Sequence, residues 1–187
     1  MLKLIVFFSL VLLAPAAAHA QAFISPLIGF DFGGDSGCPE VTACEDKNLN
    51  AGVAIGSLGS VFGAELELAY AKNFFGEIPG AESSVMTVMA NFMVAPRIGF
   101  VQPYGVIGAG LLKSRVELTP AALLETTNND AAWNAGGGVF ILLGDHFGVR
   151  GDIRYFYAFQ DVEFLGIGLD GAKLDFGRAA AAVVLRF

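Results

Sequence analysis

The stretch KLDFGRAAAAVVLRF, residues 173–187, decides the fold. From Gly177 to the end of the stretch every second side chain is apolar or glycine, which gives one uncharged face: Gly177, Ala179, Ala181, Val183, Leu185 and Phe187. The opposite face carries Arg178 and Arg186 among small residues. This period of two is typical of a β-strand and not of a helix. The stretch is longer than the usual soluble strand of about 5–6 residues and long enough to cross a bilayer when tilted.

The same alternation returns along the whole chain, with turn or loop residues after each segment. The predicted strands are residues 22–33, 48–56, 61–75, 83–95, 104–118, 131–143, 147–161 and 173–187. The connections alternate in length, so short turns gather on the side of the two termini and long loops on the other. This pattern predicts an all-β fold, an eight-stranded antiparallel transmembrane up-and-down β-barrel whose last strand pairs with its first.

Several of the connections between the predicted strands are longer than a tight turn. Residues 119–130 and 162–172 are predicted as loops, the first with a short helical turn at residues 121–124. The register of the strands on either side of residues 96–103 stays open, because this linker holds two prolines and is longer than a tight turn.

The N-terminus has the pattern of an export signal: Lys3, an apolar run over residues 4–13 and the small-x-small sequence Ala18-His19-Ala20. We therefore expect a cleaved signal peptide over residues 1–20 and one barrel domain over residues 21–187. The chain is 55% hydrophobic with a mean hydropathy of +0.60, yet no later apolar run is long enough for a spanning helix. This combination favours a membrane barrel. The net charge of −7 argues against a nucleic-acid partner.

The alternation also places charged residues on the predicted inner face. An eight-stranded barrel is just wide enough for side chains to fill it, and unpaired buried charges are costly. We therefore predict an ion-pair network in the lumen, with a narrow conducting path as the alternative. The inner face collects acids and bases in nearly equal number: Asp31, Glu65, Glu67, Glu117 and Asp152 against Lys113, Arg115, Arg150, Arg154, Arg178 and Arg186.

The residue types associated with catalysis give no coherent site. Glu65 and Glu67 resemble paired acid–base carboxylates, but two positions apart on one strand face they fit an ion-pair role better. His146, the one histidine after residue 20, has no nucleophile to join it. One histidine and two cysteines do not support a zinc site. Residues 136–138, a glycine triplet, lack the strand-to-helix context of a phosphate loop and instead allow close packing. We predict no catalytic residues, no metal and no cofactor.

Cys38 and Cys44 lie in the same predicted loop of an exported chain, so we predict an intramolecular disulfide. Closing so short a loop is worth roughly 2 kcal/mol before strain is subtracted. The bond would constrain only that loop, and we expect the double variant Cys38→Ser, Cys44→Ser to insert normally. Mass spectrometry of unreduced protein checks the bond, which two free thiols would exclude. Failed insertion of the double variant would show that the barrel needs it.

The predicted loops hold most of the negative charge of the chain. Binding sites on rigid scaffolds often lie in such loops, and an acidic loop surface also suits divalent cations that bridge to lipopolysaccharide. None of these loops carries a recognisable ligand motif. The acidic residues are Asp35, Glu40, Glu45, Asp46, Glu77, Glu82, Glu125, Asp130, Asp161, Glu163 and Asp170.

Four features in order suggest a family: Tyr104-Gly105-x-x-Gly108-Ala109-Gly110, the glycine triplet, Arg150-x-Asp152-x-Arg154-Tyr155, and the terminal Phe187. With them the chain resembles the small eight-stranded OmpA/OmpX-type barrels, the outer-membrane β-barrel domain family of Gram-negative bacteria. The resemblance covers essentially all of residues 21–187. It implies an outer-membrane location in contact with outer-membrane lipid and lipopolysaccharide. It also implies a C-terminal signal read by the barrel assembly machinery, here Leu185 and Phe187, although Ala182 stands where the family often has glycine.

These observations predict a monomeric, non-enzymatic outer-membrane barrel with a structural or surface-interaction role at the cell surface. Three alternatives stay open. A small, porin-like channel or transporter would conduct ions in planar bilayers. A lipid-active barrel enzyme would need a Ser/His/acid set at one rim. A soluble, lipocalin-like barrel would bury its apolar residues inside and be soluble without detergent.

Overall fold

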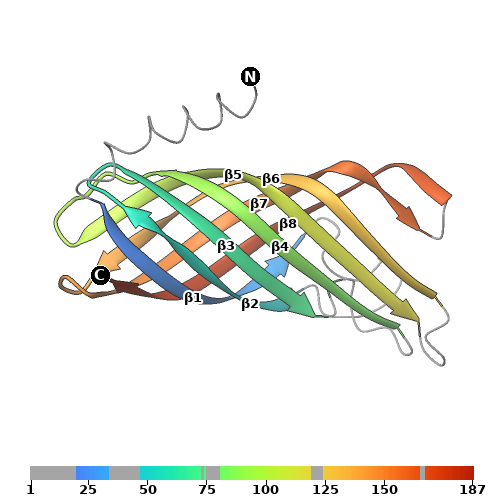
Figure 1. The fold of residues 1–187 in the computed structure, drawn as a ribbon, viewed down its shortest axis with the longest axis horizontal. Helices are drawn as coiled ribbons and strands as arrows, with labels where there is room; N and C mark the ends of the chain where they lie inside the picture. The colour runs from blue at the N-terminus through green and yellow to red at the C-terminus, as the bar shows by residue number, and fades with distance from the viewer. Residues whose placement is uncertain (1–19, 34–46, 73, 75–80, 119–123, 165–166) are drawn as a thin grey trace, which may run out of the picture.

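In a computed structural model the chain is described over residues 20–33, 47–72, 74, 81–118, 124–164 and 167–187, with backbone only at 47, 81–82, 116–118, 124–128, 160–164 and 167–173. The described residues form eight strands and no helix (Figure 1). They contain no helix long and apolar enough to cross a membrane. The strands are β1 (Gln21–Phe32), β2 (Lys47–Leu58), β3 (Phe62–Lys72), β4 (Ala81–Val94), β5 (Val101–Leu118), β6 (Leu124–Leu142), β7 (Phe147–Phe164) and β8 (Ile167–Arg186).

The strands close into one antiparallel barrel in sequence order. Closure is made by β8 pairing with β1, in a register that sets Phe23 opposite Arg186 and Asp31 opposite Arg178. This confirms the predicted fold. Because every strand has two neighbours, the barrel presents no open sheet edge along its closed part. Figure 1 shows that the strands are inclined to the long axis of the barrel. The C-terminus lies at the same end as the start of β1.

That end, which we call the turn end, holds the connections at residues 59–61, 95–100 and 143–146. Its turns are tight: the Gly59 amide donates to Phe62 O at 2.9 Å and the Leu143 amide to Phe147 O at 2.8 Å. Gly144 has a φ of 88°, which favours glycine. The other four connections, which follow β1, β3, β5 and β7, join the strands at the opposite end, the loop end. The alternation in the sequence therefore predicted which connections share an end.

The structure fixes the register across residues 96–103, which the sequence left open. β4 ends at Val94 and β5 begins at Val101, and Val94 lies opposite Gly105. A bridge between Ile98 and Val101 folds the connection into a compact turn.

At the loop end the strands run further than predicted. β6 begins at Leu124, and β7 and β8 extend to Phe164 and from Ile167, so the predicted loops 119–130 and 162–172 are largely strand. The predicted helical turn is wrong at Leu124, which pairs with Leu118, and residues 119–123 lie outside the described residues. The physical reason is the neighbouring strand. An existing ladder satisfies the backbone groups of the added residues, which outweighs their own turn preference.

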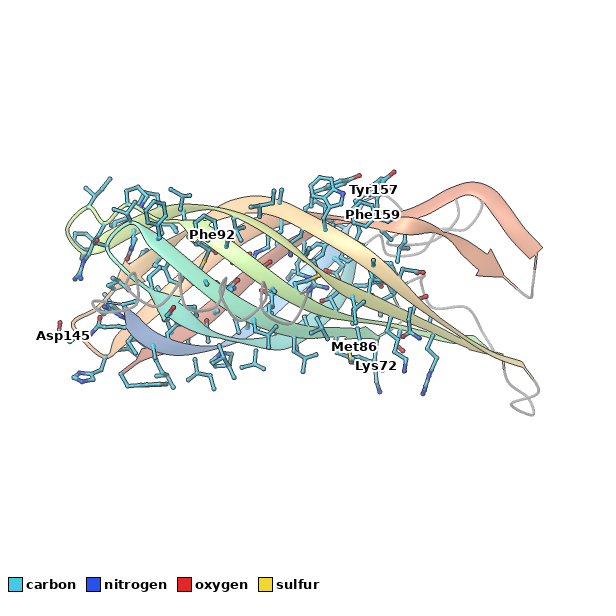
Figure 2. All side chains as sticks on the ribbon, turned by 45° about the horizontal axis from the view of Figure 1, so that its top comes forward. Lys72, Met86, Phe92, Asp145, Tyr157 and Phe159 are labelled. Carbon is cyan, nitrogen blue, oxygen red and sulfur yellow. The ribbon has the colours of Figure 1, made fainter. Side chains whose placement is uncertain are left out.

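The outer face of the barrel is apolar, with large exposed side chains along every strand but β6, where Trp133, Val139 and Ile141 are half-buried. Figure 2 shows Tyr157, Phe159 and Lys72 projecting away from the wall. Aromatic rings gather at two levels, as in the girdles of membrane barrels. Near the turn end Phe62 stacks on Phe92 with centroids 5.9 Å apart, and toward the loop end Trp133 packs against Tyr157 at 6.1 Å.

The inner face is filled by two apolar clusters with charged side chains between them. One cluster, toward the turn end, includes Phe23, Met93 and Phe140. The other, toward the loop end, includes Phe156 and Phe176, whose rings stack at 4.9 Å. The charged layer between them is the candidate site.

Candidate functional site: a charged layer inside the barrel

The centre of the charged layer is a pair of arginines on β7. Arg150 contacts Glu65 at 2.6 Å and Asp152 at 3.0 Å. Arg154 contacts Glu65 at 2.8 Å, Glu67 at 3.2 Å and Asp152 at 3.0 Å. Inward alternation on β7 puts the two arginines and Asp152 on one face, and the same alternation on β3 puts Glu65 and Glu67 opposite them across the lumen. Two strands that are not neighbours in the sheet are thereby joined through the interior.

A third arginine extends the layer to β1 and β8. Arg178 binds Asp31 through two contacts, Nε to Oδ1 at 2.7 Å and Nη2 to Oδ2 at 3.1 Å. This bidentate geometry is the strongest form of a guanidinium–carboxylate pair. Nη1 of Arg178 donates to Thr87 at 3.1 Å, and its guanidinium lies 4.8 Å from the ring centroid of Phe156. Arg178 therefore links the charged layer to the apolar cluster toward the loop end.

Neutral polar side chains donate further hydrogen bonds to three of the acids. Tyr104 donates its hydroxyl to Asp152 at 2.6 Å, Asn91 donates to Glu65 at 3.1 Å, and Asn50 donates to Asp31 at 2.8 Å. Charge-based reasoning from the sequence did not include these residues. Asn50 and Asn91 had a signal in the pattern, since each is a polar residue on the inward-facing set of its strand, whereas Tyr104 stood on the face of β5 that was predicted to point outward.

Two glycines of the triplet give this layer its space. A Cβ at Gly138 would lie 2.8 Å from Tyr104 Oη and 2.5 Å from Asp152 Cβ. A Cβ at Gly136 would lie 3.0 Å from Arg154 Cγ. Any larger side chain would displace the tyrosine or the arginine. This is the close packing that the sequence predicted for residues 136–138.

The layer is buried and contains more acids than bases. Its three arginines and four carboxylates are each less than a tenth exposed. Burying charges is costly unless each has a partner, and here every charged group contacts at least one of opposite sign. Such a layer is rigid, because moving one side chain leaves another uncompensated. The members are Asp31, Glu65, Glu67, Asp152, Arg150, Arg154 and Arg178.

The prediction for β5 is wrong, because its faces are inverted. Lys113 and Arg115 lie on the outer face, paired with Met86 and Ser84 of β4. The inner face of β5 instead carries residues such as Tyr104 and Leu112. Consecutive leucines and several glycines make both faces of this strand about equally apolar in sequence, so alternation alone gave no decision. The hydroxyl of Tyr104 can reach an acid only from the inner face.

Of the other predicted residues whose side chains the structure describes, Leu185, Arg186 and Phe187 do not join the layer. The side chain of Glu117 lies outside the described residues, as do Cys38 and Cys44 and residues 1–19. His146 is exposed in the last turn. Leu185 and Phe187, the predicted assembly signal, point outward at the turn end, and Phe187 is 70% exposed.

A closed eight-stranded antiparallel barrel with an apolar outer face, two aromatic levels and a buried ionic interior defines the class of small outer-membrane barrels. The chain belongs to the outer membrane protein beta-barrel domain family, whose model matches residues 6–187. No significant relative was found among the curated proteins.

Solved structures share this fold at low sequence identity. Neisserial surface protein A is 14% identical with a TM-score of 0.66, over 89% of this chain and 97% of that chain. The attachment invasion locus protein Ail of Yersinia pestis is 15% identical with a TM-score of 0.53, over 90% and 99%. OprG of Pseudomonas aeruginosa is 13% identical with a TM-score of 0.51, over 90% and 93%. At these identities the likeness establishes the fold alone.

Proposed function

We propose that this protein is a non-enzymatic, monomeric outer-membrane barrel that serves as a rigid scaffold for its surface loops. The observation that carries this proposal is the filled interior: a buried ionic layer lies between two apolar clusters. With the middle of the lumen occupied by packed side chains, the parts free to meet other molecules are the outer wall and the two ends of the barrel. Export through the signal peptide of residues 1–20, with the turn end in the periplasm, belongs to the same proposal.

Planar-bilayer recording separates this role from a small channel. We expect the purified protein to give no stable unit conductance, because ions would have to pass Arg150, Arg154 and Arg178 within their carboxylate contacts. Protease protection of the same sample in vesicles verifies insertion. Reproducible, ion-selective steps from verified inserted protein would favour the channel and contradict the scaffold role.

The charge of the loops indicates the kind of surface partner. Ail has been solved in complex with the heparin analogue sucrose octasulfate, a polyanion. In the present sequence the predicted loop between the first two strands is strongly acidic, for example at Glu40, Glu45 and Asp46. We propose cationic partners at the loop end, including divalent cations that bridge to lipopolysaccharide. In nanodiscs, the protein is expected to retain a cationic peptide at low salt and not heparin, and the opposite preference would contradict this.

Deleting Phe187 tests the proposed contact with the assembly machinery. In folding, the truncation removes one largely exposed ring and one hydrogen bond, from the Phe187 amide to Ala22 O at 3.0 Å. The loss of stability should therefore not exceed about 2 kcal/mol. In cells we expect a much larger loss of inserted protein, measured by quantitative blotting of outer membranes.

Phe187→Tyr is the matched control, since it keeps an aromatic ring at the terminus and should insert normally. Equal defects of the truncated protein in cells and in detergent refolding would mean that Phe187 acts through packing alone. Normal surface levels of the truncated protein would remove the terminus as a signal.

A further inference from the structure

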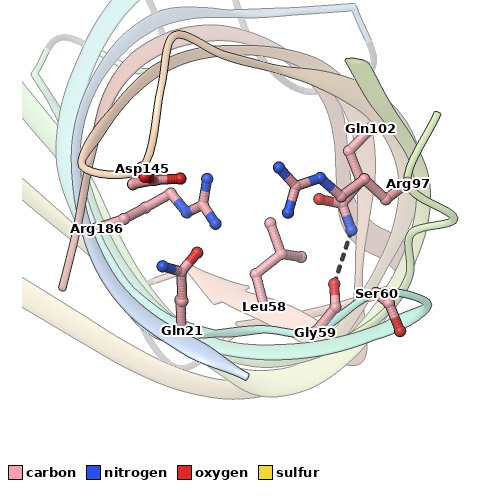
Figure 3. A pocket seen from close by; sticks show the side chains of 8 residues that line it. All are labelled: Gln21, Leu58, Gly59, Ser60, Arg97, Gln102, Asp145 and Arg186. Carbon is pink, nitrogen blue, oxygen red and sulfur yellow. Dashed lines mark hydrogen bonds between the residues drawn. The ribbon is translucent and has the colours of Figure 1, made fainter. Parts of the chain in front are cut away.

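A cavity of about 360 Å³ lies at the turn end, inside the mouth of the barrel and separate from the charged layer (Figure 3). It lies beyond the apolar cluster of Phe23 and Phe140, on the side of the termini. Since one water occupies about 30 Å³ of liquid, the cavity has room for a small ion and its remaining hydration shell. Arg97 and Arg186 both line it.

Arg186 is the unusual member of this cavity. It is the last residue of β8 and faces inward, and its backbone amide is fixed by donation to His146 O at 2.9 Å. The residue is only 5% exposed, yet its Nε and Nη1 atoms have no hydrogen-bond partner among the described residues. A buried guanidinium with unsatisfied donors is costly and calls for an acceptor. In Figure 3 its guanidinium points into the cavity.

Arg97 reaches the same cavity from the opposite side, out of the turn between β4 and β5. The turn is held by donation from the Arg97 amide to Ser60 O at 3.0 Å, and the Arg97 Nε donates to Gly99 O at 3.3 Å. Gln102 also lines the cavity, and its side-chain amide donates hydrogen bonds to Gly59 O at 2.8 Å and to Ala95 O at 2.6 Å. The turn that carries the Arg97 guanidinium is therefore held in place by hydrogen bonds.

The charges in the cavity do not balance. Two guanidiniums meet one carboxylate, Asp145, so the wall has a net positive charge. Like charges facing each other across a cavity repel, and an anion between them removes that repulsion and supplies acceptors for Nε and Nη1 of Arg186. Guanidinium donors match the oxygen pairs of phosphate and carboxylate groups. Water could fill the space but would leave the charge in place.

We propose that this cavity binds a phosphate-class oxyanion, held between Arg97 and Arg186. Two sources carry that chemistry: phosphate in solution and the phosphate of a lipid head group at the rim. Arg186 and Gln102 point inward, so the site faces the water in the mouth of the barrel. The rim of the barrel also lies close to the membrane surface, where lipid head groups are found.

The test is a titration of the full-length protein, purified from membranes in an uncharged detergent, with inorganic phosphate. Binding is followed through the arginine Nε–H resonances in nitrogen-15 NMR. We expect a saturable shift of the Arg186 and Arg97 signals, and an affinity at least about tenfold weaker in Arg97→Gln and in Arg186→Gln, because each loses charge-assisted hydrogen bonds. Arg115→Gln, an identical change on the outer face at the far end of β5, should bind like the wild type.

A second arm distinguishes the two sources. The uncharged detergent contains no phosphate, so it is the reference for nanodiscs of a phospholipid, whose head groups all carry one. If the ligand comes from solution, added phosphate should shift the same signals in the nanodiscs as in detergent. If a head group occupies the site, the signals should already be shifted in the nanodiscs and should not respond to added phosphate. Linear shifts that chloride reproduces, or equal binding by Arg97→Gln and wild type, would overturn the proposal. Because Arg97 is exposed in a turn, its variant keeps the test valid even if Arg186→Gln fails to fold.

Discussion

Replacing Arg154 with methionine is expected to destabilise the barrel by about 3–5 kcal/mol, the range for breaking a buried ion pair by removing one partner. Arg154 is 1% exposed and contacts Glu65, Glu67 and Asp152 at 2.8–3.2 Å. Methionine fills similar space, so the effect is electrostatic and not a cavity effect. The three carboxylates would share Arg150 and, at 3.7 Å from Glu67, Arg178.

Urea unfolding in lipid vesicles measures this free energy. Arg115→Met is the matched control, because Arg115 is exposed on the outer face, and we expect a change within about 0.5 kcal/mol. Combining Arg154→Met with Glu65→Gln should recover part of the loss, with a coupling energy of about 0.5–3 kcal/mol. Unchanged stability of Arg154→Met would show that the three carboxylates do not depend on Arg154 for charge compensation.

Replacing Ile153 with arginine, one residue earlier on the same strand, should cost about 2–4 kcal/mol in a bilayer. Ile153 points outward, is 62% exposed, and lies mid-strand between Gly137 of β6 and Ala179 of β8. At that depth the new guanidinium would meet hydrocarbon with no hydrogen-bond partner nearby. The two substitutions, at adjacent positions, thus test opposite faces of the barrel.

Depth dependence provides the control for this second prediction. Ile98 is 67% exposed in the turn between β4 and β5, so Ile98→Arg should lie at the interface and cost no more than about 1 kcal/mol. Both variants are measured by refolding into lipid vesicles of matched thickness. Equal costs at the two positions, or a neutral Ile153→Arg, would mean that the outer face does not meet hydrocarbon and would favour the soluble barrel.

The sequence by itself determined the fold and most strand faces. Strict alternation in β3, β7 and β8 separates charged from apolar residues so clearly that Glu65, Arg154 and Arg178 could only point inward. Side-chain direction along a strand is a local property, set by the pleat of the backbone, and a sequence records it wherever the two faces differ. β5 is the exception, because its two faces are about equally apolar in sequence. The inward direction predicted for Lys113 and Arg115 was therefore wrong.

Only the tertiary structure decided which inward groups meet. Arg178 binds Asp31 across 147 residues of sequence because closure sets β8 beside β1 in one particular register. The registers of β5 and β7 on β6 bring Tyr104 to Asp152, because both residues lie opposite Gly138. The closed barrel also leaves Arg186 facing Arg97 across the mouth cavity, although in sequence Arg186 had the same inward pattern as Arg178. Partner choice depends on strand order, register and curvature together, and these follow from the energy of the whole closed barrel rather than from any one segment.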